Sequence, residues 1–206
     1  MFQHITFFSF FLLILLSCKN SNTEKITFKN EDGSRVEYFR NKKNAAKEGA
    51  LIKFSAEGNK IEEAFYKNDT LDGERRLYFE NGNIQTIEHY VKGSFEGKLQ
   101  SFYQNGKVEI EENYVHNAIQ GELLHYYDTG EIMERVNMKD NEENGPFTEY
   151  YKNGKLKTEG TYRDGDHEDG LLKLYNENGE VYKQMNCAMG LCRTAWLHPD
   201  STTTTK

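Results

Sequence analysis

The side chains of this chain that could do chemistry are carboxylates, histidines and cysteines, and the densest group of them is acidic. Residues 163–170, Arg-Asp-Gly-Asp-His-Glu-Asp-Gly, offer the oxygen ligands that calcium prefers at Asp164, Asp166, Glu168 and Asp169. A calcium loop of the EF-hand type ends in a bidentate glutamate at its twelfth position and lies between two helices, and this segment offers neither. We therefore interpret it as a solvated turn, with a weak calcium site as the alternative.

Motifs of the common catalytic sites are absent from the sequence. It has no Gly-x-Ser-x-Gly, no His-Glu-x-x-His, no P-loop and no dinucleotide fingerprint. The net charge of −7 opposes binding to nucleic acid, which needs a basic face. We predict a protein that is not an enzyme, has no cofactor or metal ion and binds no nucleic acid. Only a site assembled in three dimensions from distant residues would escape this reasoning.

The first seventeen residues differ from the rest of the chain. The run Phe7–Leu16 is apolar except for Ser9 and is shorter than the twenty or so residues that cross a bilayer, so it fits the core of a signal peptide. Leu15-Leu16-Ser17-Cys18 resembles the lipobox of bacterial lipoproteins. This resemblance implies that Cys18 is acylated and becomes the mature N-terminus, which would anchor the protein in the cell envelope, in the outer rather than the inner membrane. The alternative is an ordinary secretory signal with an incidental cysteine.

Acylation of Cys18 would leave Cys187 and Cys192 as an even pair in an oxidising compartment. We predict a local disulfide between them. Two reduced thiols, or half of a metal site together with His198, are the alternatives, although three scattered ligands make a poor zinc site.

A repeat of 24 residues organises the remaining chain. Glycine recurs at that interval, with one inserted residue before the last member. Nine residues after each of these glycines there is a second glycine. The two columns are Gly49, Gly73, Gly97, Gly121, Gly145 and Gly170, and Gly58, Gly82, Gly106, Gly130, Gly154 and Gly179. Residues 33–48 have the character of a degenerate leading half-unit.

The second glycine column predicts one β-hairpin per repeat. It follows asparagine at Asn81, Asn105, Asn153 and Asn178, and Asn-Gly favours a two-residue type I′ turn because that turn needs positive φ at both central residues. Such a turn would place aromatics opposite aliphatics, in the pairs Phe79–Ile84, Tyr103–Val108, Tyr127–Ile132 and Tyr151–Leu156. The same register would place Gly73 opposite Tyr90, Gly97 opposite Tyr114 and Gly145 opposite Tyr162.

Alternation along the strands then sorts the side chains onto two faces. One face is apolar enough to be buried and carries Leu99, Leu123, Phe147, Leu172, Tyr66, Tyr90, Tyr114 and Tyr162. The other face is mostly charged, and one aromatic residue per repeat runs through it. We call this series the aromatic ladder: Phe54, Tyr78, Phe102, Tyr126, Tyr150 and Tyr175. The rings either stiffen the sheet by stacking on long side chains or form a ribbon of binding sites for an extended partner or a glycan.

These observations define four segments and an all-β fold, an elongated antiparallel sheet of tandem hairpins. We expect a signal peptide over residues 1–17, a tether over 18–32, the repeat array over 33–192 and a tail over 193–206. The disulfide, with Trp196 nearby, would cap the last edge of the array.

The repeated pattern resembles a known family. The spacing of Gly73, Phe79, Asn81-Gly82, Ile84 and Tyr90, and of their equivalents over residues 49–190, is similar to the MORN-variant repeat of bacterial proteins often named YwqK-type antitoxins. The resemblance implies a structural repeat without catalytic residues. It suggests a scaffold, or a neutraliser of a partner protein, although the latter fits poorly with an exported lipoprotein.

We therefore predict an envelope-anchored repeat protein that binds a protein or a polysaccharide. The alternative is a structural element whose apolar face is covered by curling or by a second copy, as in a homodimer, because a single-layer sheet leaves that face without cover.

Overall fold

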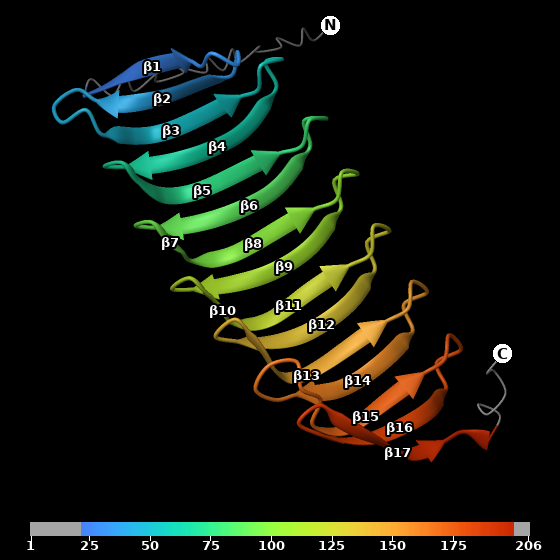
Figure 1. Ribbon diagram of the computed structural model, residues 1–206. Helices are drawn as coiled ribbons and strands as arrows, with labels where there is room; N and C mark the ends of the chain where they lie inside the picture. Colours follow the sequence, from blue (N-terminus) through green and yellow to red (C-terminus); the bar gives the residue numbers. More distant parts are fainter. Residues whose placement is uncertain (1–21, 200–206) are drawn as a thin grey trace, which may run out of the picture.

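The computed structural model describes residues 22–199, which form one open antiparallel sheet of 17 strands (Figure 1). Each long strand pairs with its neighbours in the chain, and the curved hairpins follow one another along a single axis (Figure 1). Among these residues, no helix is long and apolar enough to cross a membrane. The strands are β1 (Thr23–Lys29), β2 (Arg35–Asn41), β3 (Lys47–Phe54), β4 (Lys60–Lys67), β5 (Thr70–Tyr78), β6 (Ile84–Val91), β7 (Ser94–Phe95), β8 (Gly97–Phe102), β9 (Val108–Val115), β10 (Ala118–Ile119), β11 (Gly121–Tyr126), β12 (Ile132–Lys139), β13 (Glu142–Tyr150), β14 (Leu156–Tyr162), β15 (Gly170–Tyr175), β16 (Val181–Ala188) and β17 (Leu191–Leu197).

The sheet extends beyond the array expected from the glycine columns. Strand β1 lies inside the segment 18–32 that was expected to be a tether, and β17 continues past residue 192 into the expected tail. β1 has no repeat glycine, but Ile26 and Phe28 alternate with polar residues, and this period of two suits a strand. The signal peptide, Cys18 and residues 200–206 lie outside the described residues.

Cross-strand registers assign every strand residue to one of two faces. We call the first the packed face. It contains the row Leu51, Ala64, Arg75 and Glu88, in which each residue is directly opposite the next one on the neighbouring strand. We call the other the ladder face, because it carries the aromatic ladder. The predicted pairs Gly73–Tyr90, Gly97–Tyr114 and Gly145–Tyr162 are all present, so the predicted register is confirmed along the strands.

The predicted register is wrong at the tips of the hairpins. The amide of Phe79 donates to the carbonyl of Asn83, and the amide of Gly82 donates to the carbonyl of Phe79, which encloses a three-residue loop. Gly82 has a φ of 85°, and Asn81 is not among the residues with positive φ, so the loop is a type I turn followed by a left-handed glycine. Tyr78 rather than Phe79 is therefore opposite Ile84, and a bulge at the next residue restores the register. The same correction applies to the predicted pairs of Tyr103, Tyr127 and Tyr151, because Phe102, Tyr126 and Tyr150 are the paired residues.

The type I′ turns that were expected at the hairpin tips are found at the connections between successive hairpins. Asn68 and Asp69 have φ of 50° and 63°, and the residues on either side of them, Lys67 and Thr70, are paired. His116-Asn117 and Asp140-Asn141 repeat this conformation. In each connection the second residue donates its amide to a carbonyl of the preceding repeat, as from Asn117 to Phe95 at 3.1 Å. These bonds join successive repeats along one long edge of the sheet.

The small hydrophobic core lies on the packed face of the later hairpins. Val136, Met138, Phe147, Leu172 and Cys187 form one buried cluster. The Tyr162 ring stacks on Phe147 with 4.0 Å between ring centroids, whereas in the earlier repeats Phe95 lies between Tyr90 and Tyr114 at 4.3 and 4.7 Å. Of the residues predicted to be buried on this face, Phe147 and Leu172 are buried and the others are half-buried, so the prediction is confirmed only in part.

Candidate binding surfaces

The aromatic ladder runs across the ladder face as predicted, with one half-buried ring per repeat. Each ring from Tyr78 to Tyr175 is paired with an aliphatic residue of the next strand, namely Ile84, Val108, Ile132, Leu156 and Val181. Two strand spacings separate successive rings, a distance of about 9.6 Å. The ladder is thus an apolar stripe on a face that is mostly charged beyond the first hairpins.

The hydroxyl groups of three ladder tyrosines are tied to the neighbouring hairpin. Tyr78 donates to Glu63, and the equivalent bonds are Tyr126 to Glu111 at 3.3 Å and Tyr175 to Glu159 at 2.8 Å. Each glutamate also binds a lysine: Lys60, Lys98 and Lys173, respectively. Burial, followed by the adjacent carboxylate, raises the pKa of Tyr78 and of Tyr175.

The two repeats without a ladder hydroxyl group support the same structural role. Phe54 and Phe102 stand where the other repeats have tyrosine, and the residues equivalent to the accepting glutamate are Phe39 and Ile87. A tyrosine next to isoleucine would have no carboxylate to bind. The hydroxyl groups of Tyr78, Tyr126 and Tyr175 therefore hold hairpins together, whereas Tyr150 has Arg135 at the equivalent position. The faces of the rings remain the part of the ladder that a ligand could contact.

The packed face carries an ion network that the sequence analysis did not predict. Glu62 and Glu88 are only 6% and 8% exposed, and Arg75 bridges them, with Nε 2.8 Å from Glu62 and Nη1 3.0 Å from Glu88. Lys53 also binds Glu62, at 2.7 Å. Burial by itself would raise the pKa of Glu62, but the hydrogen bonds from Lys53 and Arg75 outweigh it and lower the pKa. Burial together with Glu88 raises the pKa of Tyr90 to about 12.

A second group of carboxylates lies further along the same face. Glu134 is directly opposite Glu149 on the neighbouring strand, which places like charges together. Glu149 accepts from Thr158 at 2.7 Å and lies 3.2 Å from Lys157. Burial, and secondly Glu149, raises the pKa of Glu134. These acids do not form a metal site, since no three ligating side chains gather in the described part of the chain.

The asparagine column has a role that differs from the one predicted for it. Asn105 Oδ1 accepts from the amide of Lys107 in its own turn, while Nδ2 donates to the carbonyl of Asp128 in the next turn at 2.9 Å. Asn81 and Asn153 make the equivalent bonds to Gln104 and Glu177. Asparagine is therefore repeated because it links neighbouring tips. The recurrence was visible in the sequence, but its partner was not.

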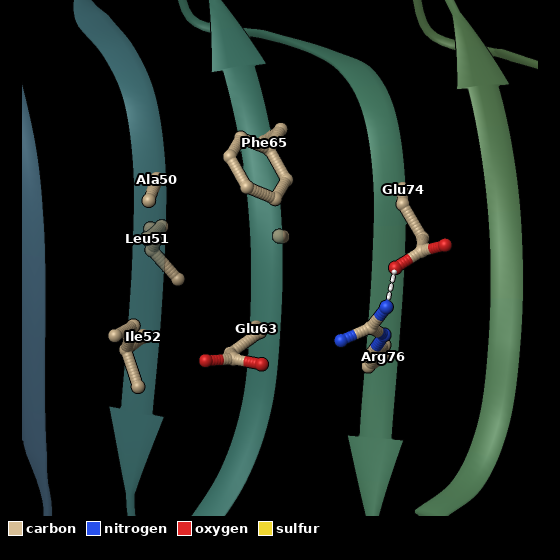
Figure 2. A pocket seen from close by; sticks show the side chains of 8 residues that line it. Ala50, Leu51, Ile52, Glu63, Phe65, Glu74 and Arg76 are labelled. Atoms are coloured by element: carbon tan, nitrogen blue, oxygen red, sulfur yellow. Dashed lines mark ion pairs between the residues drawn. The ribbon is translucent and has the colours of Figure 1, made fainter. Parts of the chain in front are cut away.

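A depression of about 420 Å³ lies on the ladder face near the start of the sheet (Figure 2). Ala50, Ile52 and Phe65 form its apolar part, and Arg76, bound to Glu74, lies on the adjacent strand β5 (Figure 2). Phe65 is 49% exposed, and Phe39 on β2 is 40% exposed. Sequence analysis did not single out either phenylalanine, although both interrupt a column that is polar in later repeats.

The remaining predicted sites are separate from these surfaces. Cys187 and Cys192 are cross-strand neighbours on β16 and β17, and their sulfur atoms are bonded at 1.98 Å. In the acidic segment 163–170, Arg163 pairs with Asp169 at 2.8 Å, and His167 Nδ1 lies 3.1 Å from the carbonyl oxygen of Asp164. Among residues 22–199 this segment is not part of any metal-ligating cluster.

Comparison with known proteins identifies the repeat. The model of the MORN repeat variant matches residues 71–92, 95–116, 119–140, 143–164 and 168–186, more than half of the chain. The chain belongs to this family. No curated protein matches it. A porin-like protein from Bacteroides uniformis has 9% identity, with 82% of this chain and 91% of that chain covered, and its TM-score of 0.22 is too low to carry an argument.

Each match to the MORN repeat variant corresponds to one structural repeat. The first begins at Leu71 in β5 and ends in the connection after β6, and the next three have the same extent. Strands β1–β4, which carry Phe39 and Phe65, precede the first match. The first hairpins therefore continue the sheet outside the matched repeats.

Proposed function

We propose that this protein is an envelope-anchored, non-enzymatic scaffold that binds a protein or a polysaccharide on the ladder face of its sheet. The observation that carries the proposal is the aromatic ladder, in which a half-buried ring recurs at the same position of every repeat on one continuous surface. An extended partner with its own repeating units could contact several rings at once, and the contacts would add in the manner of multivalent binding.

The anchoring of the rings supports this use of the ladder. The bonds from Tyr78, Tyr126 and Tyr175 to glutamates fix the orientation of each ring before any ligand arrives. A rigid aromatic surface loses little conformational entropy on binding, so more of the contact energy remains as affinity. Acylation of Cys18, implied by its lipobox-like context, would hold the scaffold at the membrane.

Crosslinking from intact cells, with a ladder variant for comparison, tests the proposal. Replacing Phe102, Tyr126 and Tyr150 with serine should abolish capture of the partner. A Tyr126→Phe chain, which keeps the ring and loses the hydroxyl group, should retain capture. The matched control changes Val91 and Val115 to serine, because these residues are 50% and 40% exposed and lie outside the ladder.

The variants must be compared at equal folding, which melting curves establish. Equal capture by the folded ladder variant and the wild type would contradict binding through the rings. Loss of capture in the Val91/Val115 control would show that the assay responds to any loss of exposed apolar surface.

Self-association is a second candidate function, favoured by the last strand. Leu191 and Trp196 of β17 are 79% and 41% exposed, and within residues 22–199 β17 pairs only with β16. An unpaired edge with apolar side chains is a template for another chain. Light scattering on the acyl-free protein tests this function: a stable dimer that becomes a monomer on Trp196→Lys substitution would support it.

A further inference from the structure

One repeat column changes its chemistry at the N-terminal end of the sheet. It consists of the residues just before the packed-face tyrosine column, and in the later hairpins they are polar: His89, Asn113, Asn137, Thr161 and Asn186. Two of these side chains lie beside a repeat glycine: a Cβ built on Gly97 would be 3.9 Å from the Cβ of His89, and one on Gly145 would be 3.4 Å from that of Asn137. In the first hairpins Phe65 is beside Gly73 and Phe39 is beside Gly49, at 3.0 and 4.0 Å.

These two phenylalanines are the most exposed members of an apolar patch. They belong to β2 and β4, which flank β3 in the sheet (Figure 1), and Ala50 and Ile52 of β3 lie beside Phe65 (Figure 2). In later repeats the positions of Ala50 and Ile52 hold mainly charged or polar residues, such as Glu74 and Arg76 in the next one. The patch is therefore specific to the start of the sheet and is not a property of the repeat.

Lysines border the same patch. Lys25 on β1 is directly opposite Phe39, so it lies on the ladder face, and its side chain is 55% exposed while pairing with Glu37. Lys29 shares that face and is exposed. Phenylalanine next to lysine is the composition of surfaces that lie at the boundary of a bilayer, where rings enter the headgroup region and ammonium groups meet phosphates.

The short segment between Cys18 and β1 limits how far this patch can lie from a membrane to which Cys18 is anchored. Asn22 accepts a hydrogen bond from the amide of Lys42 at 3.0 Å, so the ordered sheet already begins there. Asn22 is four positions after Cys18 in the chain, and a fully extended link of that length spans at most about 14 Å. If Cys18 carries the lipid, β1 stays within this distance of the bilayer. β4 is three strands further along, about 14 Å at the usual strand spacing.

We propose that the ladder face of strands β1–β4 rests on the phospholipid surface, with Phe39 and Phe65 among the headgroups and Lys25 and Lys29 toward the phosphates. The proposal rests on the proposed acylation of Cys18 and adds to it a second membrane contact, made by the folded sheet. Because Phe39 and Phe65 would be in contact with lipid, the aromatic ladder from Phe102 onward would remain available to a partner.

The distribution of charge supports this orientation. The connections far from β1 are acidic, with Asp140, Asp164, Asp166 and Asp169, whereas Glu31 and Asp32 in the first connection are matched by Lys42 and Lys43 in the second. An anionic lipid surface repels such groups and attracts lysines within a screening distance of about 10 Å. The first hairpins would therefore face the membrane while the later ones point away from it.

Fluorescence of single tryptophans tests the contact. The chain has one tryptophan, Trp196 on β17, at the end of the sheet opposite to the patch. The probes are Phe65→Trp and, independently, Phe39→Trp, each combined with Trp196→Phe. Leu171→Trp in the same background is the matched control, since Leu171 on β15 is 47% exposed, lies on the ladder face and is far from β1.

Each chain, beginning at Cys18, is coupled through the Cys18 thiol to a maleimide-bearing phospholipid in vesicles of phosphatidylcholine and phosphatidylglycerol. Cys18 is the only cysteine outside the disulfide, so the coupling is selective. Vesicles with brominated acyl chains should quench the tryptophan at position 65 or 39 and leave unchanged the one at 171 and, in the chain without substitutions, Trp196. Circular dichroism establishes that each variant is folded, and two probe positions guard against a substitution that is not tolerated.

Unquenched emission at both 65 and 39 would overturn the proposal, as would equal quenching at all four positions. Because the anchor is attached chemically, the result does not depend on whether cells acylate Cys18. That point is settled separately by mass spectrometry of the N-terminal peptide of the native protein, so failure of the docking proposal and failure of the lipid anchor can be distinguished.

Discussion

Replacement of Arg75 by leucine would test whether the buried ion network stabilises the packed face. Leucine is the residue that the next two repeats have in this column, at Leu99 and Leu123. The substitution therefore fits the repeat, and a hydrophobicity argument alone would predict a gain in stability. We expect a loss, because Glu62 and Glu88 are 6% and 8% exposed and both bind Arg75.

The size of the loss follows from what remains after the change. Glu62 keeps Lys53 at 2.7 Å, but among residues 22–199 Glu88 keeps only the hydroxyl group of Tyr90 at 3.1 Å. Removing one member of a buried ion pair costs about 3–5 kcal/mol. The Arg75 side chain is still 28% exposed, so water would compensate part of this cost, and we expect the free energy of unfolding to fall by about 2–3 kcal/mol.

A triple replacement separates the charge effect from packing. Changing Glu62, Arg75 and Glu88 together to leucine removes all three buried charges, and buried ion networks can often be exchanged for apolar residues without loss of stability. The triple variant should therefore recover most of what Arg75→Leu loses. A double-mutant cycle on Arg75 and Glu88 gives the coupling between this pair directly.

Urea unfolding followed by far-ultraviolet circular dichroism measures these differences, with unchanged m-values as the condition for comparing midpoints. The pKa of Glu62 is lowered, so its stabilisation is present at neutral pH and disappears as the pH falls below 4.5. The difference between wild type and Arg75→Leu should shrink over the same range. A loss below about 0.5 kcal/mol, the usual effect of a neutral surface change, or a triple variant as unstable as the single one would refute the reasoning.

Three further predictions concern other columns of the repeat. Glu134→Gln should raise the stability at pH 7, because the raised pKa of Glu134 means that its charge opposes folding. The melting temperature of the wild type should therefore rise relative to that of the variant as the pH falls toward 4.5. Asn105→Ala should lower the free energy of unfolding in urea by about 1 kcal/mol by removing the bond to the next tip, whereas Thr129→Asn, which installs the asparagine that its repeat lacks, should raise it by a similar amount. A loss of stability in both variants would contradict the linking role. Gly73→Ala should destabilise more than Gly82→Ala in the same measurement. Both glycines have positive φ, but a methyl group added at Gly73 would lie 3.0 Å from the Cβ of Phe65, whereas one added at Gly82 would have no other atom within 4 Å.

The turn at the hairpin tips shows why a correct fold can contain a wrong local geometry. Asn-Gly is compatible with a two-residue type I′ loop and with a three-residue loop that ends in a left-handed glycine. The choice changes the partner of Ile84 from Phe79 to Tyr78, yet the bulge after Ile84 restores the pair of Gly73 and Tyr90. Because two irregularities compensate each other, the alternation along the strand did not reveal either of them.

The sequence by itself determined the repeat, the all-β architecture, the two faces and the placement of the aromatic ladder, since glycine spacing and alternation of side chains are local properties that a period of 24 residues displays several times. Tertiary structure decided what happens only once or between repeats. Arg75 pairs with Glu62 and Glu88 across strands, Asn105 binds a carbonyl in the next turn, and Phe39 and Phe65 form one patch with the residues of β3. Such contacts depend on the register and on the distance between neighbouring hairpins, and these quantities are fixed only when the whole sheet has formed.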